Sequence, residues 1–347
     1  MSKPRIAVYA LGGTIAMVPG ATGVVPGLSA AQLTAAVPGL GDVAQIRAET
    51  IAMVASPNLD LDIVLEVAAR IRADAARGDT DGWVVTQGTD TIEETAFLLD
   101  LLLAGFGSPV IVTGAMRNPM MVAPDGPANI LNAVRAAASP ILVHEAEALG
   151  VLVTLNDTLH AAAEVVKANT HRLDAFTSPQ TGPVGLLIED SVMLTGAPRR
   201  PWRDAVAGLL AGHDLATLKT RKAPVLLAGI TVTDPGLLLD HLAASDDRLG
   251  YGGIVLAGMG GGHVPARMMA SVATLAAALP VVIAGRVGNG PLLTRTYEYA
   301  GSEMDLARHG VLSAGRLHPL KCCGLLELAL RCRADRATIA GLLAGFA

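Results

Sequence analysis

The sequence predicts an α/β protein with a larger N-terminal α/β domain, built on a mostly parallel sheet, and a smaller C-terminal α/β domain. Short β-branched runs alternate with longer Ala- and Leu-rich segments, which is the pattern of strands followed by helices in α/β folds. The chain has 347 residues, more than the roughly 250–300 at which a single hydrophobic core stops growing. A stretch rich in Pro and Arg at residues 195–202 interrupts the alternation and separates the two halves.

Strands are expected where short β-branched runs precede a turn, and helices where apolar residues recur every three or four positions. In the N-terminal half these rules predict strands at residues 6–11, 83–86, 110–113 and 151–155, and helices at 91–103 and 128–138. In the C-terminal half they predict strands at 225–230, 254–257 and 281–284, and helices at 237–244, 267–278 and 320–331. We therefore expect a first domain over residues 1–198, a linker over 199–223 and a second domain over 224–347.

Composition restricts the class of protein. Hydrophobic residues make up 51% of the chain and charged residues 16%, so the chain can bury a large core. Residues such as Asp100, Pro224 and Pro280 interrupt the apolar runs before they reach the roughly 18 residues of a membrane span, and no transmembrane helix is expected. The net charge of −5 and the 3% of aromatic residues argue against nucleic acid as a partner and favour a small polar substrate.

The N-terminus and the cysteines bear on the cellular compartment. Residues 1–5 run directly into the first expected strand without the regions of a signal peptide. Cys322, Cys323 and Cys332 lie close together near one expected helix and do not make a disulfide framework. We expect the mature protein to begin at Met1 and to be cytoplasmic.

The first expected strand ends in the sequence Leu-Gly-Gly-Thr-Ile-Ala at residues 11–16. Open α/β sheets bind ligands at the carboxyl ends of their strands, and glycines there let the backbone approach a substrate closely. Thr14 is therefore a candidate catalytic hydroxyl, although the segment also fits a tight turn in which Thr14 caps a helix. The segment lacks the third glycine of a dinucleotide fingerprint and the lysine of a P-loop, which disfavours phosphate binding.

A second polar segment follows the strand at 83–86 and is expected at the same edge of the sheet. It reads Thr-Gln-Gly-Thr-Asp-Thr at residues 86–91 and places Thr89 and Asp90 directly ahead of an amphipathic helix. Asp90, with Glu93 three positions later, also has the form of a helix capping box. Asp90 is thus a candidate either for a ligand-binding carboxylate or for a cap.

Lys167 lies between apolar residues after the strand at 151–155. A threonine hydroxyl is a poor nucleophile at neutral pH and needs a base, and a lysine neutralised by burial is one of the few side chains that serve. Thr89, Asp90 and Lys167 are therefore candidates for a proton relay. The alternative is that Lys167 is a solvated surface lysine.

The segments at residues 11–16 and 86–96 resemble the two signature motifs of bacterial-type L-asparaginases. Residues 112–117, 125–129, 153–158 and 167–170 resemble stretches of the same family, so the resemblance extends over essentially the whole chain. It implies that the protein hydrolyses L-asparagine to L-aspartate and ammonia, with glutamine as a weaker substrate, and that it uses no metal or cofactor. It further implies that Thr14 is the nucleophile of an acyl-enzyme and that Thr89, Asp90 and Lys167 form a second triad that handles proton transfer and water.

The resemblance also implies how the substrate is held. Ser56 would hold the α-carboxylate and Asp90 the α-ammonium, while backbone N–H groups near Thr89 and Ala115 would stabilise the tetrahedral oxyanion. In this family each site lies between two subunits, in a homotetramer or tight dimer. Glu298 is the candidate for the acid that a partner subunit supplies.

Four positions depart from the family pattern. Leu11 stands where a threonine is common, Gln87 where a histidine is frequent, and Pro57 where a polar residue usually reaches toward the ligand. The expected lid at residues 17–28 contains no tyrosine, although the family usually supplies one there to assist the nucleophile, and Gly23 lies near that place. These departures affect two properties: the selectivity for the side chain of the substrate, and the identity of the group that accepts the proton of Thr14.

Other enzyme classes fit less well. The sequence has no Gly-x-Ser-x-Gly elbow, and its eight histidines are scattered without an HExxH motif. The glycine-rich segment at 258–263 follows a strand and suggests an NAD(P)-dependent oxidoreductase, but the next strand does not end in an acidic residue. An amino-acid-binding sensor that kept the fold and lost turnover is the non-enzymatic alternative.

Overall fold

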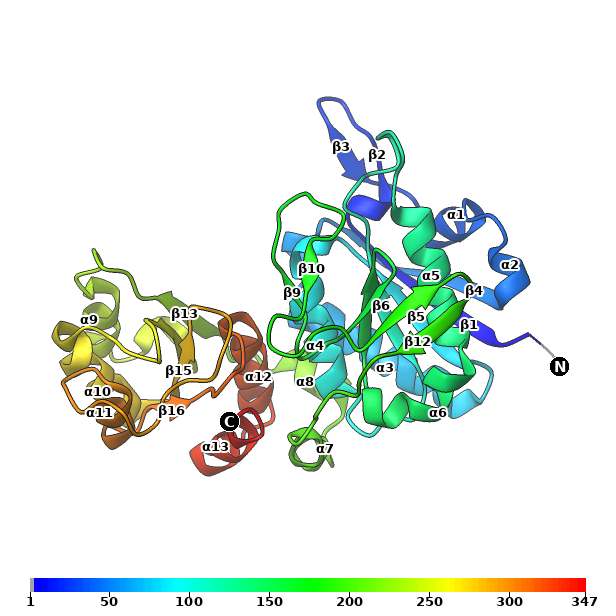
Figure 1. The fold of residues 1–347 in the computed structure, drawn as a ribbon. Helices are drawn as coiled ribbons and strands as arrows, with labels where there is room; N and C mark the ends of the chain where they lie inside the picture. Colours follow the sequence, from blue (N-terminus) through cyan, green and yellow to red (C-terminus); the bar gives the residue numbers. More distant parts are fainter. Residues whose placement is uncertain (1–2) are drawn as a thin grey trace. The chain divides into compact units, whose positions relative to one another are not determined.

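The computed structural model describes residues 3–347, and the chain divides into two compact units after Arg199. Each unit contains a β-sheet with helices packed on both of its faces (Figure 1). The two units are described one at a time. Among residues 3–347, no helix has both the length and the apolar character needed to cross a membrane.

The N-terminal unit is built on an eight-stranded sheet. The strands lie in the order β12 (Ser191–Leu194), β11 (Gly185–Ile188), β8 (Thr158–Ala161), β7 (Leu152–Leu155), β6 (Val110–Thr113), β5 (Gly82–Thr86), β1 (Arg5–Gly12) and β4 (Gln45–Val54). The five strands from β7 to β4 run parallel to their neighbours, and β8, β11 and β12 extend the sheet as an antiparallel edge. This mostly parallel sheet confirms the fold class that the sequence predicts.

Helices cover both faces of this sheet. They are α1 (Ala30–Ala35), α2 (Leu40–Val43), α3 (Leu61–Arg77), α4 (Ile92–Leu102), α5 (Gly126–Ala138) and α6 (Pro140–Leu149). Ile6 and Val8 of β1 share a buried cluster with residues of α1 and α5, whereas the Tyr9 side chain reaches α3. Because β1 is buried on both faces, it reads as a nearly continuous apolar run instead of an alternating one.

Two short hairpins complete the N-terminal unit. β2 (Met17–Pro19) pairs with β3 (Val24–Pro26), and the N–H of Gly20 closes the turn on the carbonyl of Gly23. β9 (Val166–Lys167) pairs with β10 (Phe176–Thr177). Figure 1 shows the β2–β3 hairpin projecting from the body of the unit.

The C-terminal unit has a parallel sheet of four strands, in the order β13 (Val225–Gly229), β14 (Gly253–Gly258), β15 (Val281–Gly285) and β16 (Leu312–Ser313). Its helices are α7 (Arg203–Leu210), α8 (Leu215–Thr220), α9 (Leu237–Ala244), α10 (Met269–Ala278), α11 (Glu303–Arg308), α12 (Pro319–Arg331) and α13 (Arg336–Ala344). Helices α9 and α10 pack together in one apolar cluster with the sheet, and α12 packs on β13 and β14. The segment 199–223, expected as a linker, therefore contains α7 and α8.

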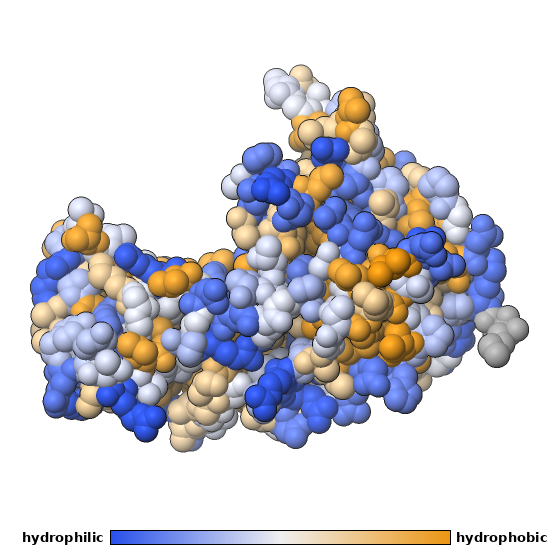
Figure 2. Space-filling view, in the orientation of Figure 1, coloured by the Kyte–Doolittle hydropathy of each residue, from blue (hydrophilic) through white to orange (hydrophobic). Residues whose placement is uncertain are grey.

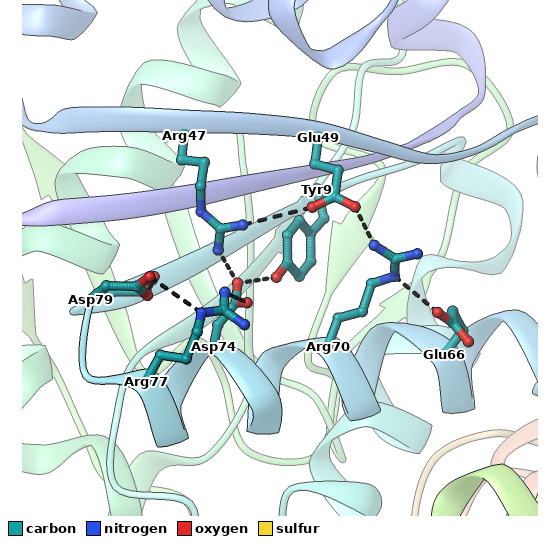
Figure 3. A network of polar contacts seen from close by, with 9 residues as sticks. Tyr9, Arg47, Glu49, Glu66, Arg70, Asp74, Arg77 and Asp79 are labelled. Atoms are coloured by element: carbon teal, nitrogen blue, oxygen red, sulfur yellow. Dashed lines mark hydrogen bonds and ion pairs between the residues drawn. The ribbon is translucent and has the colours of Figure 1, made fainter.

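A network of polar side chains fastens α3 to the edge of the large sheet (Figure 3). Its members come from β1, β4, α3 and the turn after α3, and they are Tyr9, Arg47, Glu49, Glu66, Arg70, Asp74, Arg77 and Asp79. Asp74 is the centre: its buried carboxylate contacts the Tyr9 hydroxyl and the guanidinium groups of Arg47 and Arg77. Burial raises the pKa of the Tyr9 phenol, which therefore donates its hydrogen bond as a neutral group.

Replacing Tyr9 with phenylalanine is expected to lower the free energy of unfolding by about 2 kcal/mol, because a buried hydrogen bond to a charged acceptor is lost while the ring stays in place. Urea unfolding checks this value. Tyr297→Phe is the matched control, since that ring is 43% exposed and its change is expected to stay within about 0.5 kcal/mol. Equal losses in the two variants would contradict the role given to the Tyr9 hydroxyl.

Candidate active site

Thr14 follows the carboxyl end of β1 through two glycines in left-handed conformations. Gly12 has φ 94° and Gly13 has φ 80°, and a Cβ atom on Gly13 would lie 1.9 Å from the backbone nitrogen of Gly88. The loop of β1 thus packs backbone against backbone on the loop that follows β5. Thr14 begins a short 3-10 turn (Thr14–Ala16) in which no side chain caps the N-terminus, so the capping interpretation of Thr14 is wrong.

The Thr14 hydroxyl is half-buried, and among residues 3–347 no side chain or backbone group forms a hydrogen bond with it. An unengaged hydroxyl at the strand edge is free to face a ligand. Within residues 3–199, therefore, no base is in hydrogen-bonding contact with Thr14.

Thr89 and Asp90 lie in the 3-10 turn (Thr89–Thr91) between β5 and α4. Thr89 is buried, and Thr91 occupies the N-cap of α4, where its side chain makes no capping hydrogen bond and donates instead to the carbonyl of Ser56. Asp90 therefore does not act as the cap that its spacing to Glu93 suggested. Its carboxylate turns instead toward Lys167 and Ser56.

Lys167, on β9, brings the relay candidates together. Its Nζ donates to Thr89 Oγ1 at 2.8 Å and to Asp90 Oδ1 at 2.5 Å. The Lys167 side chain is only 12% exposed, so the alternative of a solvated surface lysine is wrong. The hydrogen bond from Lys167 lowers the pKa of Asp90; partial burial opposes this shift without cancelling it.

Ser56 completes this side of the site. It follows β4 in the 3-10 turn Ser56–Asn58, is buried, and donates from Oγ to Asp90 Oδ2 at 3.2 Å. A Cβ atom on Gly88 would lie 2.8 Å from Ser56 Oγ, so the loops after β4 and β5 also pack closely. The structure therefore places Ser56 and Lys167 on the two oxygens of one carboxylate.

Ala115 lies in the loop after β6, and it is fully buried. A Cβ atom on the preceding residue, Gly114, would lie 2.6 Å from the carbonyl oxygen of Gln87 and 3.2 Å from Thr89 Cγ2. The Ala115 loop thus packs directly against the loop that carries Thr89. Four loops from neighbouring parallel strands converge at one edge of the sheet, and they include the two segments, with Thr14 and Thr89, that the sequence predicts at this edge.

A pocket of about 420 Å³ opens beside these residues, and its lining consists of Asp90, Glu93, Lys167, Ala168, Asn169 and Thr170. The sequence suggests Glu93 only as a capping partner of Asp90, and its carboxylate lies instead at this pocket. Its spacing of three residues from Asp90, on the same face of the turn and helix, is the signal that places both acids at the pocket.

The candidate partner acid, Glu298, is 74% exposed and pairs with Arg308. The buried acid of this region is Glu303. It accepts hydrogen bonds of 2.7 Å from the N–H groups of Thr296 and Tyr297 and one from His263 at 3.0 Å. Burial works to raise the pKa of Glu303, but the backbone hydrogen bonds outweigh it and hold the pKa below its usual value.

The four tyrosines outside the expected lid have different surroundings. The Tyr9 phenol is committed to Asp74, and the Tyr299 phenol contacts His263 Nδ1 at 2.9 Å. Tyr297 and Tyr299 are both exposed. His263 contacts both side chains, so in the C-terminal unit the exposed phenol of Tyr299 is linked by two hydrogen bonds to the buried carboxylate of Glu303.

The glycine-rich segment after β14 does not form a dinucleotide site. Met259 and His263 pair as an isolated bridge, and the N–H of Gly262 bonds to the Met259 carbonyl, so the chain turns back on itself. The next α-helix, α10, begins only at Met269. A dinucleotide fingerprint opens its helix at the glycines themselves, and the oxidoreductase alternative is therefore not supported.

Comparison with known proteins identifies the family. The model for the N-terminal asparaginase domain matches residues 5–200, and the model for the glutaminase/asparaginase C-terminal domain matches residues 225–343. L-asparaginase 2 of Bacillus subtilis is 34% identical over 94% of this chain and 82% of its own length; L-asparaginase 2 of Escherichia coli is 32% identical over 95% and 90%. The crystal structure of a probable cytoplasmic L-asparaginase from Campylobacter jejuni superimposes with a TM-score of 0.84, 32% identity and 99% coverage of both chains. These matches confirm the resemblance seen in the motifs: the chain belongs to the asparaginase family.

Proposed function

We propose that the protein is an L-asparaginase, which hydrolyses L-asparagine to L-aspartate and ammonia through an acyl-enzyme on Thr14. The observation that carries this proposal is the contact of Lys167 Nζ with both Thr89 Oγ1 and Asp90 Oδ1. Thr89 and Asp90 belong to the loop after β5, which packs on the glycine turn before Thr14. A hydroxyl, a half-buried amine and a carboxylate in mutual contact suit acyl transfer. The names of the relatives support L-asparagine as the substrate.

In the first half-reaction Thr14 Oγ attacks the side-chain amide carbon of the substrate. The amide nitrogen leaves with the hydroxyl proton of Thr14 as ammonia, and an ester to Thr14 remains. In the second half-reaction a water adds to the ester, and Thr89 with Lys167 takes its proton. Collapse of this intermediate returns the proton to Thr14 and releases L-aspartate.

Substrate binding follows from the charges of the site. Asp90, which is 61% exposed, attracts the α-ammonium, and Ser56 donates to the α-carboxylate. Backbone N–H groups near Thr89 and Ala115 stabilise the oxyanion of each tetrahedral intermediate. In this scheme residues 1–198 carry the nucleophile and the second triad, residues 199–223 lead into the second domain, and residues 224–347 form that domain.

Ammonia release from L-asparagine, L-glutamine and succinamic acid, measured on one preparation, tests the proposal. We expect release from L-asparagine, less from L-glutamine, and none that depends on added NAD(P). Binding of L-asparagine without ammonia release would instead identify an amino-acid sensor, the function that the absence of a lid phenol favours. The cytoplasmic location, supported by the name of the Campylobacter jejuni structure, is tested by cell fractionation.

Placing a phenol in the β2–β3 hairpin is expected to raise kcat. Gly23 is the position of choice, because a Cβ atom there meets nothing within 4 Å. A positioned general acid or base contributes about 10²–10⁴-fold, so Gly23→Tyr should raise kcat measurably if Thr14 lacks a proton acceptor. Gly23→Phe is the matched control. If kcat stays flat in Gly23→Tyr and falls in Tyr299→Phe, the acceptor is the phenol beside His263.

We expect the active protein to be a homotetramer or at least a tight dimer. Large apolar side chains are exposed on the N-terminal unit, among them Ile141, Val143, Ile188 and Met193, and Figure 2 shows apolar surface gathered on this unit. Such surface is typical of protein interfaces. Light scattering on enzyme at its assay concentration measures the mass, and a fully active monomer would contradict the expectation.

A further inference from the structure

Lys167 is carried by a hairpin that lies outside the large sheet. β9 and β10 form a separate two-stranded sheet, in which Phe176 lies opposite Lys167. A two-stranded hairpin is only marginally stable by itself, so its packing on the rest of the unit must fix the place of Lys167. Val165 and Ala175, where the hairpin joins its flanking segments, are fully buried.

A buried pair of polar side chains, His160 and Ser178, ties the returning end of this hairpin to the large sheet. His160 belongs to β8, and Ser178 directly follows β10. His160 Nδ1 and Ser178 Oγ are joined by a hydrogen bond of 2.9 Å, and each residue is no more than 5% exposed. The bond therefore closes the segment 160–178, which contains Lys167, into a loop anchored on β8.

His160 points to the face of the sheet on which the hairpin lies. Its neighbours in β8, Leu159 and Ala161, belong to the apolar cluster that includes residues of α1 and α5. Since successive side chains of a strand point to opposite faces, His160 faces the other side of the sheet. On that side α4 packs on β6 and β7, and it also contacts β9 (Figure 1).

The His160 ring is neutral near neutral pH, because burial lowers its pKa to about 4. A neutral imidazole has one N–H and one lone pair, and a hydroxyl such as that of Ser178 can pair with either. An apolar contact tolerates small displacements, whereas a hydrogen bond weakens steeply with distance and angle. A buried pair of this kind therefore specifies one position for the hairpin, where apolar packing alone would allow several.

We infer that His160 and Ser178 are positioning residues for the proton relay, because their hydrogen bond holds the hairpin that carries Lys167. This inference rests on the proposed function, in which Lys167 takes part in proton transfer. Lys167 Nζ donates to Thr89 at 2.8 Å and to Asp90 at 2.5 Å, so a shift of about 1 Å would break both contacts. A misplacement of this size can lower a rate by about 10²-fold.

Kinetics in two backgrounds test the inference. Ser178→Ala removes the hydroxyl with little change of shape, and His160→Phe replaces the imidazole with an apolar ring. Each change should lower kcat for L-asparagine by about 10- to 100-fold in the otherwise unmodified enzyme. In Lys167→Met protein, which has no amine left to position, the same changes should alter the residual kcat by less than about twofold. Loss of kcat by the same factor in both backgrounds would overturn the inference, because the pair would then act through something other than Lys167.

Hydrogen exchange, followed by mass spectrometry, tests the anchoring without turnover. In Ser178→Ala the amide hydrogens of residues 165–177 should exchange about tenfold faster, because local opening no longer breaks a buried hydrogen bond. Exchange in β5 should stay the same. Exchange at residues 165–177 that does not change would overturn the inference.

Ser191→Ala is the matched control. Its hydroxyl donates to the carbonyl of Ile188 in the hairpin formed by β11 and β12, so its loss should change neither kcat nor exchange at residues 165–177. If the unmodified protein releases no ammonia from L-asparagine, the proposed function itself fails. Exchange at residues 165–177 then still decides whether His160 and Ser178 anchor the hairpin.

Discussion

Thr14→Ala is expected to reduce ammonia release from L-asparagine by about 10⁴-fold or more, because it removes the attacking oxygen and loss of a nucleophile has effects of this order. The fold should remain intact. The Thr14 hydroxyl makes no hydrogen bond within residues 3–347, and the residue lies at the start of a turn, not in the core. The free energy of unfolding should change by no more than about 0.5 kcal/mol. Ammonia release and urea unfolding, measured on the same sample, check both statements.

Thr34→Ala is the matched control for this change. The Thr34 hydroxyl bonds only to carbonyl groups within α1, so its loss should leave ammonia release unaltered. Ammonia release by Thr14→Ala at the unmodified rate would show that another residue attacks the substrate.

Thr89→Val and Lys167→Met are each expected to lower kcat by about 10²–10⁴-fold, the usual contribution of a proton-transfer group. Because the two side chains share one hydrogen bond of 2.8 Å, either change breaks the same relay. The double variant should therefore lose much less than the product of the two single losses. Steady-state kcat for the four proteins of the cycle provides the measurement.

The control cycle combines Thr89→Val with Lys3→Met, whose Nζ bonds to the carbonyl of Gly41. Lys3 has no contact with the relay, so here the effects should multiply. If Thr89→Val and Lys167→Met also multiplied fully, the two residues would act independently and the shared relay would be ruled out.

The sequence predicted the parts of the fold in which burial is uniform. β1, β5 and β6 are buried along nearly their whole length, and they appear as compact apolar runs at the expected positions. β4 was not predicted, because this edge strand alternates polar and apolar residues and carries Arg47 and Glu49, which belong to the network around Asp74. Edge strands face water and neighbouring helices, so their pattern is weaker.

The candidate active site, like the fold, has features that the sequence predicted and features that it did not. The edge of the sheet at which Thr14 and Thr89 meet followed from strand order. The contact of Lys167 with Thr89 joins residues 78 apart, and no periodicity or spacing rule connects them. The chemistry of a lysine base made Lys167 a candidate for the relay, and the family resemblance implied the same role, but neither predicted this contact. The pairing of Ser56 with Asp90 spans 34 residues and was equally invisible to local patterns.

The two helices in the expected linker were missed for a different reason. Residues 203–210 and 215–220 form α7 and α8, each less than three turns long. Helices this short depend on packing against other elements more than on their own propensity, so the sequence around them reads as a polar loop. The Pro-rich stretch before them contains Arg199, after which the chain divides into two compact units.

The contact between Gly13 and Gly88 has a consequence for attempts to change the substrate range. A Cβ atom on Gly13 would lie 1.9 Å from the nitrogen of Gly88 and one on Gly88 would lie 2.8 Å from Ser56 Cβ, so neither glycine accepts an added methyl group. In a library of variants with substitutions at residues 12–14 and 87–89, nearly all proteins should therefore be inactive toward any substrate that is tested. Diversity is better directed to Ala168, Asn169 and Thr170, which line the pocket but take no part in that contact. The spacing between Thr14 and Thr89 then stays unchanged, while substitutions alter the space around the ligand.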